Sequence, residues 1–131
     1  MISPTAKTRT KTVRPRVKIW LESDGESVLC HGLCDILKAV EETGSIKSAA
    51  AKVGRSYRFV WSRIKDAETA FGTTLVETRV GGREANRSEL SPLSKDLLNN
   101  FDTLCQQVYH LVDGAFAEQL KTTLKRHRGR E

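Results

Sequence analysis

The chain has 131 residues, of which 38% are hydrophobic and 29% charged, a composition typical of one globular domain. No apolar run approaches the roughly 20 residues that a membrane span needs, so we expect no membrane partner. The polar, basic N-terminus lacks the apolar stretch of a secretory signal, and we therefore expect a cytoplasmic protein.

The net charge of +6 is unevenly distributed. Residues 1–18 hold six Lys and Arg and no acid, residues 45–90 hold nine against five acids, and residues 121–131 hold five against one. A basic central block with basic ends is typical of a protein that contacts phosphate groups with one face. For the two ends alone, simple solubility is an equally good interpretation.

The N-terminal third begins without hydrophobic periodicity, and residues 1–15 are predicted to be a disordered basic arm. Residues 16–22 then alternate polar and apolar side chains, the period of a half-buried strand. Asp24-Gly25 favours a type I′ turn, after which residues 27–30 form a second strand. This part of the chain therefore predicts a small hairpin.

From residue 32 the apolar period changes to three or four residues, which predicts helices. Three helices begin near Gly32, Ser45 and Ser56 and end at Gly44, Gly54 and Gly72. Serine is a preferred N-cap and glycine a common stop signal. Because only Gly54-Arg55-Ser56 separates the last two, the three helices predict a helix-turn-helix.

A hairpin and one long helix follow. Residues 75–79 and 88–90 are predicted strands, and this position after a recognition helix is typical of a wing. Ser91-Pro92 opens a helix that runs to about Leu120, after which the chain is predicted to fray. Its apolar residues repeat every 3.5 residues, as in a coiled-coil seam: Leu97, Phe101, Leu104, Val108, Leu111 and Ala115.

A helix of about 30 residues is roughly 45 Å long, which exceeds the width of so small a domain. We therefore expect its seam to form a homodimer interface, the alternative being that the helix folds back on its own domain. The predicted fold class is mainly α with small β, a winged helix-turn-helix plus a long C-terminal dimerisation helix. The expected division is a disordered arm (1–15), a DNA-binding domain (16–90), a dimerisation helix (91–120) and a basic tail (121–131).

A recognition helix enters the major groove of DNA with its N-terminal turns. The residues of the third helix that lie opposite its apolar face, and are therefore expected to meet bases, are Ser56, Tyr57, Arg58, Trp61, Ser62 and Lys65, with Arg63 at the flank. Arg58 presents a planar fork that suits guanine or a phosphate. For Trp61, packing in the core is an equally good interpretation.

Backbone contacts are expected on either side of this helix. The start of the second helix and the turn after it offer hydroxyl, amide and cationic groups to phosphates through Ser45, Lys47, Ser48 and Arg55. The wing offers Arg79, Arg83 and Arg87, which would lie along the backbone or probe the minor groove.

The segment 44–54, followed by residues 56–68, resembles the helix-turn-helix of LysR-type regulators. Within that superfamily the chain resembles the DNA-binding domain of ModE-type molybdate-responsive regulators. The more specific cues are Ser56-Tyr57-Arg58 with Trp61, the wing residues 80–83, and Leu90-Ser91-Pro92-Leu93.

This resemblance covers about residues 17–120. It implies a homodimer, joined mainly by the long helix, that binds a palindromic operator on double-stranded DNA and represses molybdenum-related genes. Family members also carry C-terminal oxyanion-binding domains, which residues 121–131 do not provide. We therefore expect no cofactor, and any molybdate response to come through a separate ligand-sensing subunit.

Two other binding functions remain open. A thiol- or metal-responsive switch would use Cys30 and Cys34, with His31, Cys105 and His110 as further candidates, but the second ligand pair of a zinc site is missing and no metal site is expected. An oxyanion could also bind at the helix starts near Ser45 or Ser91.

No enzyme is expected, because the sequence has no phosphate-cradling glycine loop, paired carboxylates or nucleophile–base arrangement. RNA binding is compatible with the charge alone, but a recognition helix fits the major groove of duplex DNA.

Overall fold

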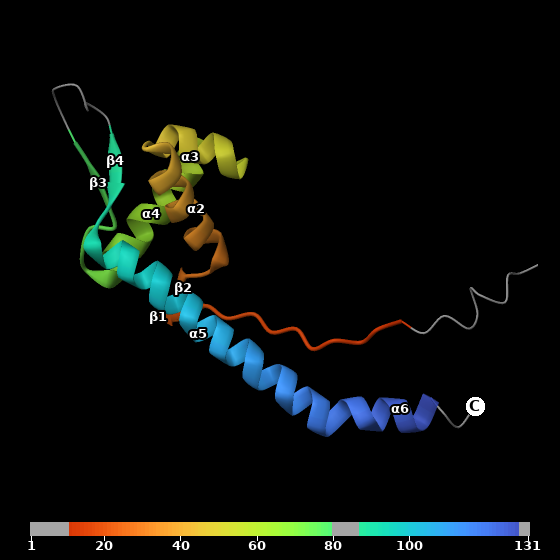
Figure 1. The fold of residues 1–131 in the computed structure, drawn as a ribbon. Coiled ribbons are helices and arrows are strands. Elements are labelled where there is room, and N and C mark those ends of the chain that lie inside the picture. Colours follow the sequence, from red (N-terminus) through yellow and green to blue (C-terminus); the bar gives the residue numbers. More distant parts are fainter. Residues whose placement is uncertain (1–10, 80–86, 129–131) are drawn as a thin grey trace, which may run out of the picture. The chain divides into compact units, whose positions relative to one another are not determined.

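The computed structural model describes residues 11–79 and 87–128 (Figure 1). It divides into two compact units. The core unit is Lys18–Cys105. The second unit, here called the arm–tail unit, joins the N-terminal segment up to Val17 with the residues from Gln106 onward, and its described parts are 11–17 and 106–128.

The core unit begins with an antiparallel hairpin of β1 (Leu21–Ser23) and β2 (Glu26–Leu29). Asp24 and Gly25 both have positive φ, 52° and 81°, which confirms the type I′ turn. The first strand is shorter than predicted, since residues 16–20 are irregular. The alternating pattern alone could not set this limit, because a strand extends only as far as its partner, and β2 pairs with no residue before Leu21.

Three helices follow: α2 (His31–Thr43), α3 (Ile46–Val53) and α4 (Tyr57–Phe71). Their predicted end signals are confirmed. The hydroxyl of Ser45 accepts a hydrogen bond from the Ser48 N–H at 3.0 Å, and that of Ser56 accepts one from the Phe59 N–H at 3.1 Å. Each helix also ends at the predicted glycine, which adopts the left-handed conformation.

The core lies where these helices meet each other and the strands. Its largest fully buried side chains are Leu29, Leu33, Leu37, Ile64, Leu75, Val40 and Val60. Burying one such side chain contributes about 1.5–3 kcal/mol. Ala49 and Ala50 of α3 are also buried, and their small size lets neighbouring helices approach α3 closely.

The wing consists of β3 (Val76–Thr78) and β4 (Ser88–Leu90), paired antiparallel with Val76 opposite Leu90. Both predicted strands are therefore present, with β3 one residue shorter at each end. Residues 80–86, including Arg83 and the Gly81-Gly82 pair, lie outside the described residues.

The long helix α5 (Pro92–Phe116) begins as predicted at Pro92, and the Ser94 N–H donates to the Ser91 hydroxyl at 3.2 Å. It continues through a π-helical turn, η1 (Ala117–Lys121), into α6 (Thr122–Arg128). The helical run thus passes Leu120, where the sequence predicted its end. Residues 115–128 contain neither glycine nor proline, so no residue of the kind that ordinarily stops a helix stands there. Among the described residues, no helix is both long and apolar enough to span a membrane.

Candidate nucleic-acid interface

The outer face of α4 carries the residues that the sequence assigned to base contacts. Val60, Ile64 and Ala67 are buried on its inner face. On the other side Tyr57 and Trp61 are 52% and 44% exposed, and the side chains of Ser56, Arg58 and Ser62 are also exposed. Trp61 therefore lies on the exposed face of α4 and is not packed in the core of this chain.

Lys65 lies at the far end of this surface and is partly engaged. Its ammonium group is 3.1 Å from Glu68 Oε1 and 5.6 Å from the centre of the Trp61 ring. The pair of contacts fixes the lysine beside the aromatic ring, although the side chain stays exposed.

Two arginines near α4 contact other side chains of the domain. Arg63 is half-buried, and its Nη2 donates to Cys30 Sγ at 3.5 Å. The guanidinium of Arg55 stacks on the Phe59 ring, 3.7 Å from its centre. Both arginines line one pocket of about 350 Å³ together with Cys30 and Phe59. Because Arg63 contacts Cys30, it does not extend from the exposed face of α4 as Arg58 does.

The first turn of α3 presents a second polar surface. Lys47 and Ser48 are exposed, whereas Ser45 is half-buried and its oxygen already accepts the capping bond. The free N–H groups of a helix start attract phosphate oxygens. This turn therefore has the charge and donors that a phosphate contact needs.

Two arginines of the wing, Arg79 and Arg87, share the carboxylate of Glu89. Arg79 Nη2 lies 3.3 Å from Glu89 Oε2, and Arg87 Nε lies 3.8 Å from Glu89 Oε1. The Arg87 side chain also lies against Gly44, where an added Cβ would meet its Nη1 at 3.6 Å. Both guanidinium groups remain exposed, so they stay accessible to a polyanion.

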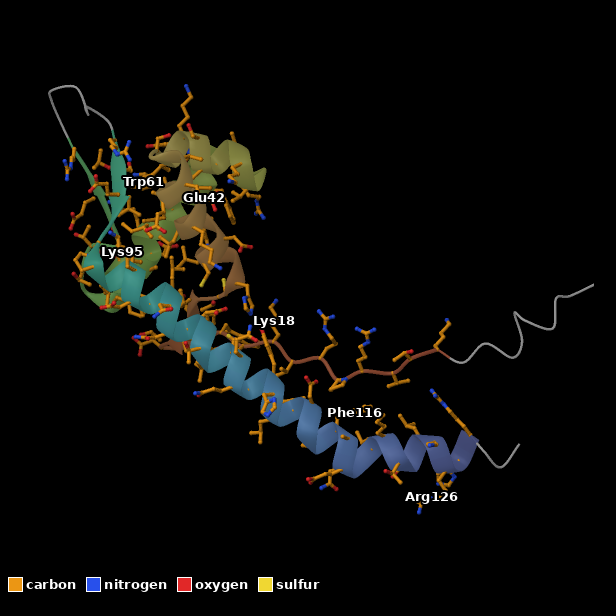
Figure 2. All side chains as sticks on the ribbon, in the orientation of Figure 1. Lys18, Glu42, Trp61, Lys95, Phe116 and Arg126 are labelled. Carbon is orange, nitrogen blue, oxygen red and sulfur yellow. The ribbon has the colours of Figure 1, made fainter. Side chains whose placement is uncertain are left out.

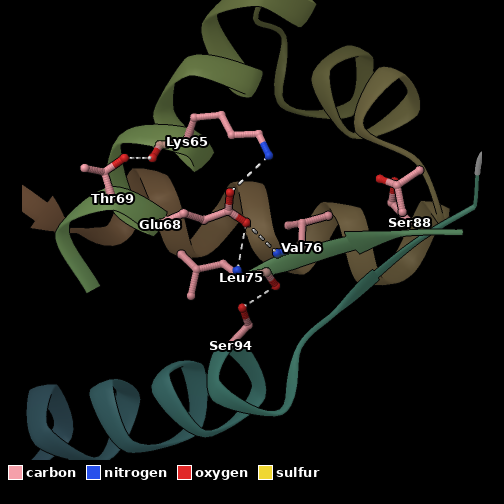
Figure 3. A network of polar contacts seen from close by, with 8 residues as sticks. Lys65, Glu68, Thr69, Leu75, Val76, Ser88 and Ser94 are labelled. Atoms are coloured by element: carbon pink, nitrogen blue, oxygen red, sulfur yellow. Dashed lines mark hydrogen bonds and ion pairs between the residues drawn. The ribbon is translucent and has the colours of Figure 1, made fainter. Parts of the chain in front are cut away.

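The carboxylate of Glu68 joins α4 to the wing (Figure 3). It accepts hydrogen bonds from the backbone N–H groups of Leu75, at 2.8 Å, and Val76, at 3.1 Å. The Leu75 carbonyl in turn accepts from the Ser94 hydroxyl at 2.5 Å and from the Ser91 N–H at 2.9 Å. These bonds hold the end of α4, the first wing strand and the start of α5 together.

The sequence patterns did not indicate Glu68 or Ser94 as residues of the site. The signal that could have indicated Glu68 is an acid in the last turn of a helix, just ahead of a strand whose first N–H groups need acceptors. Partial burial acts to raise the pKa of Glu68, but the N–H donors of Leu75 and Val76 and the charge of Lys65 outweigh it. The pKa is lowered from the ordinary value.

The three cysteines are all free thiols. Partial burial acts to raise the pKa of Cys30, but backbone N–H groups of Leu33 and Gly32 and the Arg63 guanidinium outweigh it and lower the pKa. Cys34 is buried, and this desolvation raises its pKa to about 11. No group of three or more His, Cys, Asp or Glu placed to hold a metal ion occurs in the part of the chain that the structure describes.

The predicted seam of α5 is divided between inward and outward positions. Phe101 is only 5% exposed and packs against the His31 ring, with 5.7 Å between ring centres. At this position the helix does contact its own domain. Leu104 and Leu111 are 41% and 71% exposed. The other seam positions are half-buried or exposed: Leu97, Val108 and Ala115.

These elements define a winged helix-turn-helix. Residues 33–92 match the family described as bacterial regulatory helix-turn-helix protein, lysR family. That family is one of DNA-binding transcriptional regulators rather than a class of enzymes.

Within this class the chain is similar to ModE proteins, as the sequence resemblance indicated. It is 35% identical over 63 residues to the molybdenum transport protein ModE of Herbaspirillum seropedicae, a match covering 48% of this chain and 23% of that protein. It is 33% identical over 69 residues to the transcriptional regulator ModE of Yersinia pestis, covering 53% of this chain and 26% of that one. The matched part thus spans about a quarter of the length of these relatives.

The fold has a counterpart among solved structures. A LysR family transcriptional regulator superposes with a TM-score of 0.50 and 18% identity, over 71% of this chain and 30% of that one. At that identity the likeness concerns the fold alone.

Proposed function

We propose that this chain is a sequence-specific transcriptional regulator that binds a palindromic operator as a homodimer. The observation that carries the proposal is the exposed face at the start of α4, where Tyr57, Arg58 and Trp61 lie opposite the buried side of the helix. Helix-turn-helix proteins insert this end of the recognition helix into the major groove.

The proposed contacts fall into two kinds. Arg58 reads a base, with the aromatic rings of Tyr57 and Trp61 against thymine methyl groups or sugars. The groups around α4 fix the position of the domain by contacting phosphates. These positioning groups are Ser45, Lys47, Ser48, Arg55, Arg79, Arg83 and Arg87.

We propose that the outward apolar positions of α5 form the dimer interface. Leu104 and Leu111 expose large apolar side chains in the single chain, and a partner helix would remove them from water. A two-fold dimer places two recognition helices in successive major grooves, which requires half-sites about 10–10.5 base pairs apart.

We propose further that the regulated genes serve molybdenum metabolism and that the bound dimer represses them by covering a promoter. The support is the likeness to proteins named molybdenum transport protein ModE and transcriptional regulator ModE. If the operator response depends on molybdate, a separate ligand-sensing subunit is the proposed receptor.

The test is a selection of bound duplexes from random DNA by the purified protein, at fixed salt, with and without molybdate. An enriched inverted repeat supports the regulator, and stronger enrichment with molybdate supports direct sensing. Enrichment that is independent of molybdate assigns sensing to another subunit. No enriched sequence contradicts the proposal.

A further inference from the structure

The arm–tail unit brings together two basic segments that stand at opposite ends of the sequence. Arg128 Nη2 donates to the Lys11 carbonyl at 3.4 Å. Val13, Phe116 and Leu124 line one groove of about 420 Å³. Four cations also line this groove, from both segments: Lys11, Lys121, Lys125 and Arg128.

The unit is strongly cationic. Residues 11–17 and 106–128 hold seven Lys and Arg against two acids, Asp113 and Glu118. The seven cations, here called the basic strip, are Lys11, Arg14, Arg16, Lys121, Lys125, Arg126 and Arg128. All seven are exposed, and no ion pair joins any of them to an acid within the described residues. Figure 2 shows nitrogen-tipped side chains along the N-terminal segment and around α6, where Arg126 is labelled.

The helix concentrates this charge on one side. Lys121, Lys125 and Arg128 are spaced by four and three residues and all line the same groove. Like charges at this spacing repel and weaken a helix. A row of bound phosphates would offset that repulsion, since each contact neutralises a cation and releases counterions from the nucleic acid.

We propose that the basic strip binds the phosphates of duplex DNA that flanks the operator. This inference rests on the proposed function, because a dimer held on its operator presents two such strips to the same duplex at high effective concentration. Lysine and arginine side chains that contact phosphates position a protein on the duplex without reading bases. The strip therefore adds affinity and salt dependence, and it leaves the preferred sequence unchanged.

The test compares two double variants with the same loss of charge. The first, Lys121→Gln with Lys125→Gln, removes two cations of the strip. The control, Lys38→Gln with Lys95→Gln, removes two exposed lysines of the core unit that border the acids Glu41 and Asp102. Binding is measured from about 50 to 200 mM salt, on a long duplex with flanks and on one trimmed to the selected repeat.

On the long duplex the strip variant is expected to bind at least about tenfold more weakly at low salt. Its slope of log K against log salt should be shallower by about 0.9 for each phosphate that the strip no longer neutralises. On the trimmed duplex it should match the wild type, and the control should match the wild type on both. The charge-conserving variant Lys121→Arg with Lys125→Arg should restore the slope, which separates removal of charge from a damaged helix.

An unchanged slope on the long duplex overturns the inference, as does an equal loss of affinity on the trimmed duplex. A strip variant that loses binding only to single-stranded RNA or to anionic vesicles overturns it as well. These outcomes differ from a failure of the proposed function, because in that case the wild type itself would prefer no duplex sequence.

Discussion

The carbonyl oxygen of Gly44 accepts a hydrogen bond from the backbone N–H of Ser88 at 2.7 Å. Gly44 ends α2 with φ of 79°, and Ser88 begins the second wing strand. The bond thus links the wing to the turn that leads into α3. Two surfaces that we assign to phosphate contacts, the α3 start and the wing, are held together at this point.

The substitution Gly44→Ala is expected to destabilise the domain by about 1–2 kcal/mol, because an L-residue is strained in the left-handed conformation that Gly44 adopts. The Ser88 amide should also exchange with solvent faster, which NMR-detected hydrogen exchange would measure. Gly72→Ala is the matched control, with φ of 71° and nothing within 4 Å of an added Cβ. It should cost similar stability and leave the Ser88 amide protected. If the Ser88 amide of Gly44→Ala exchanges as slowly as that of the wild type, the conformation of Gly44 does not control the bond between Ser88 and Gly44.

Glu68→Gln should lower stability by about 1 kcal/mol at pH 7, because the two backbone N–H donors lose a charged acceptor. The pKa of Glu68 is lowered in the folded chain, so its contribution is present above the ordinary value of 4.5 and is lost as pH falls through the folded-state pKa. Urea unfolding of both proteins from pH 7 to pH 3 should show the difference shrinking in acid. A constant difference across this range would refute the assignment.

Arg58→Ala is expected to relax base preference at one position of each half-site, at a cost of about 1–3 kcal/mol. Lys47→Ala, at the start of α3, should instead weaken binding equally on all sequences. Both effects are read from titrations on the selected operator and its single-base variants. Equal losses for Arg58→Ala on specific and random DNA would mean that Arg58 contacts only phosphate.

Leu104→Asp is expected to dissociate the dimer, because it places a charge on the outward apolar face of α5. The affinity for the operator should fall as the dimer dissociates. Gln106→Asp adds the same charge roughly on the opposite side of the helix and should leave the dimer intact. Sedimentation velocity distinguishes the monomer from the dimer. A Leu104→Asp variant that stays dimeric would show that the interface lies elsewhere.

Cys30 should react with iodoacetamide faster than Cys34 in the folded protein. Its lowered pKa gives more thiolate at pH 8, whereas the pKa of Cys34 is about 11 and its side chain is buried. Peptide mass spectrometry after timed labelling measures both rates. Under our account, diamide or a chelator leaves operator affinity unchanged. A large drop in affinity with either reagent would favour the thiol- or metal-responsive alternative.

The sequence predicted most of the fold because the local signals in this chain are strong. The serine caps of α3 and α4 and the glycine stops of α2, α3 and α4 act within a few residues of each helix end, and all were confirmed. The Asp24-Gly25 turn and the Ser91-Pro92 helix start are equally local. The length of the first strand was wrong, because strand length depends on a partner and not on alternation.

The candidate site was less predictable, since side-chain direction depends on contacts between distant residues. The spacing of Arg63 places it at the flank of α4, and only the fold brings Cys30, 33 residues earlier, within reach of it. In the same way the 3.5-residue repeat includes Phe101 without indicating that it packs against His31. The contact of Glu68 with Leu75 and Val76 likewise depends on the path of the turn that leads from α4 into the wing.

The central claim is that the exposed face of α4 reads a DNA sequence. The most direct test is the ratio of affinities for the selected repeat and for a scrambled duplex of the same composition and length, at one near-physiological salt concentration. Our account predicts a ratio in the range of about 10³–10⁷, with two chains bound per repeat. A ratio near one would contradict it and leave a basic protein that binds DNA only through its charge.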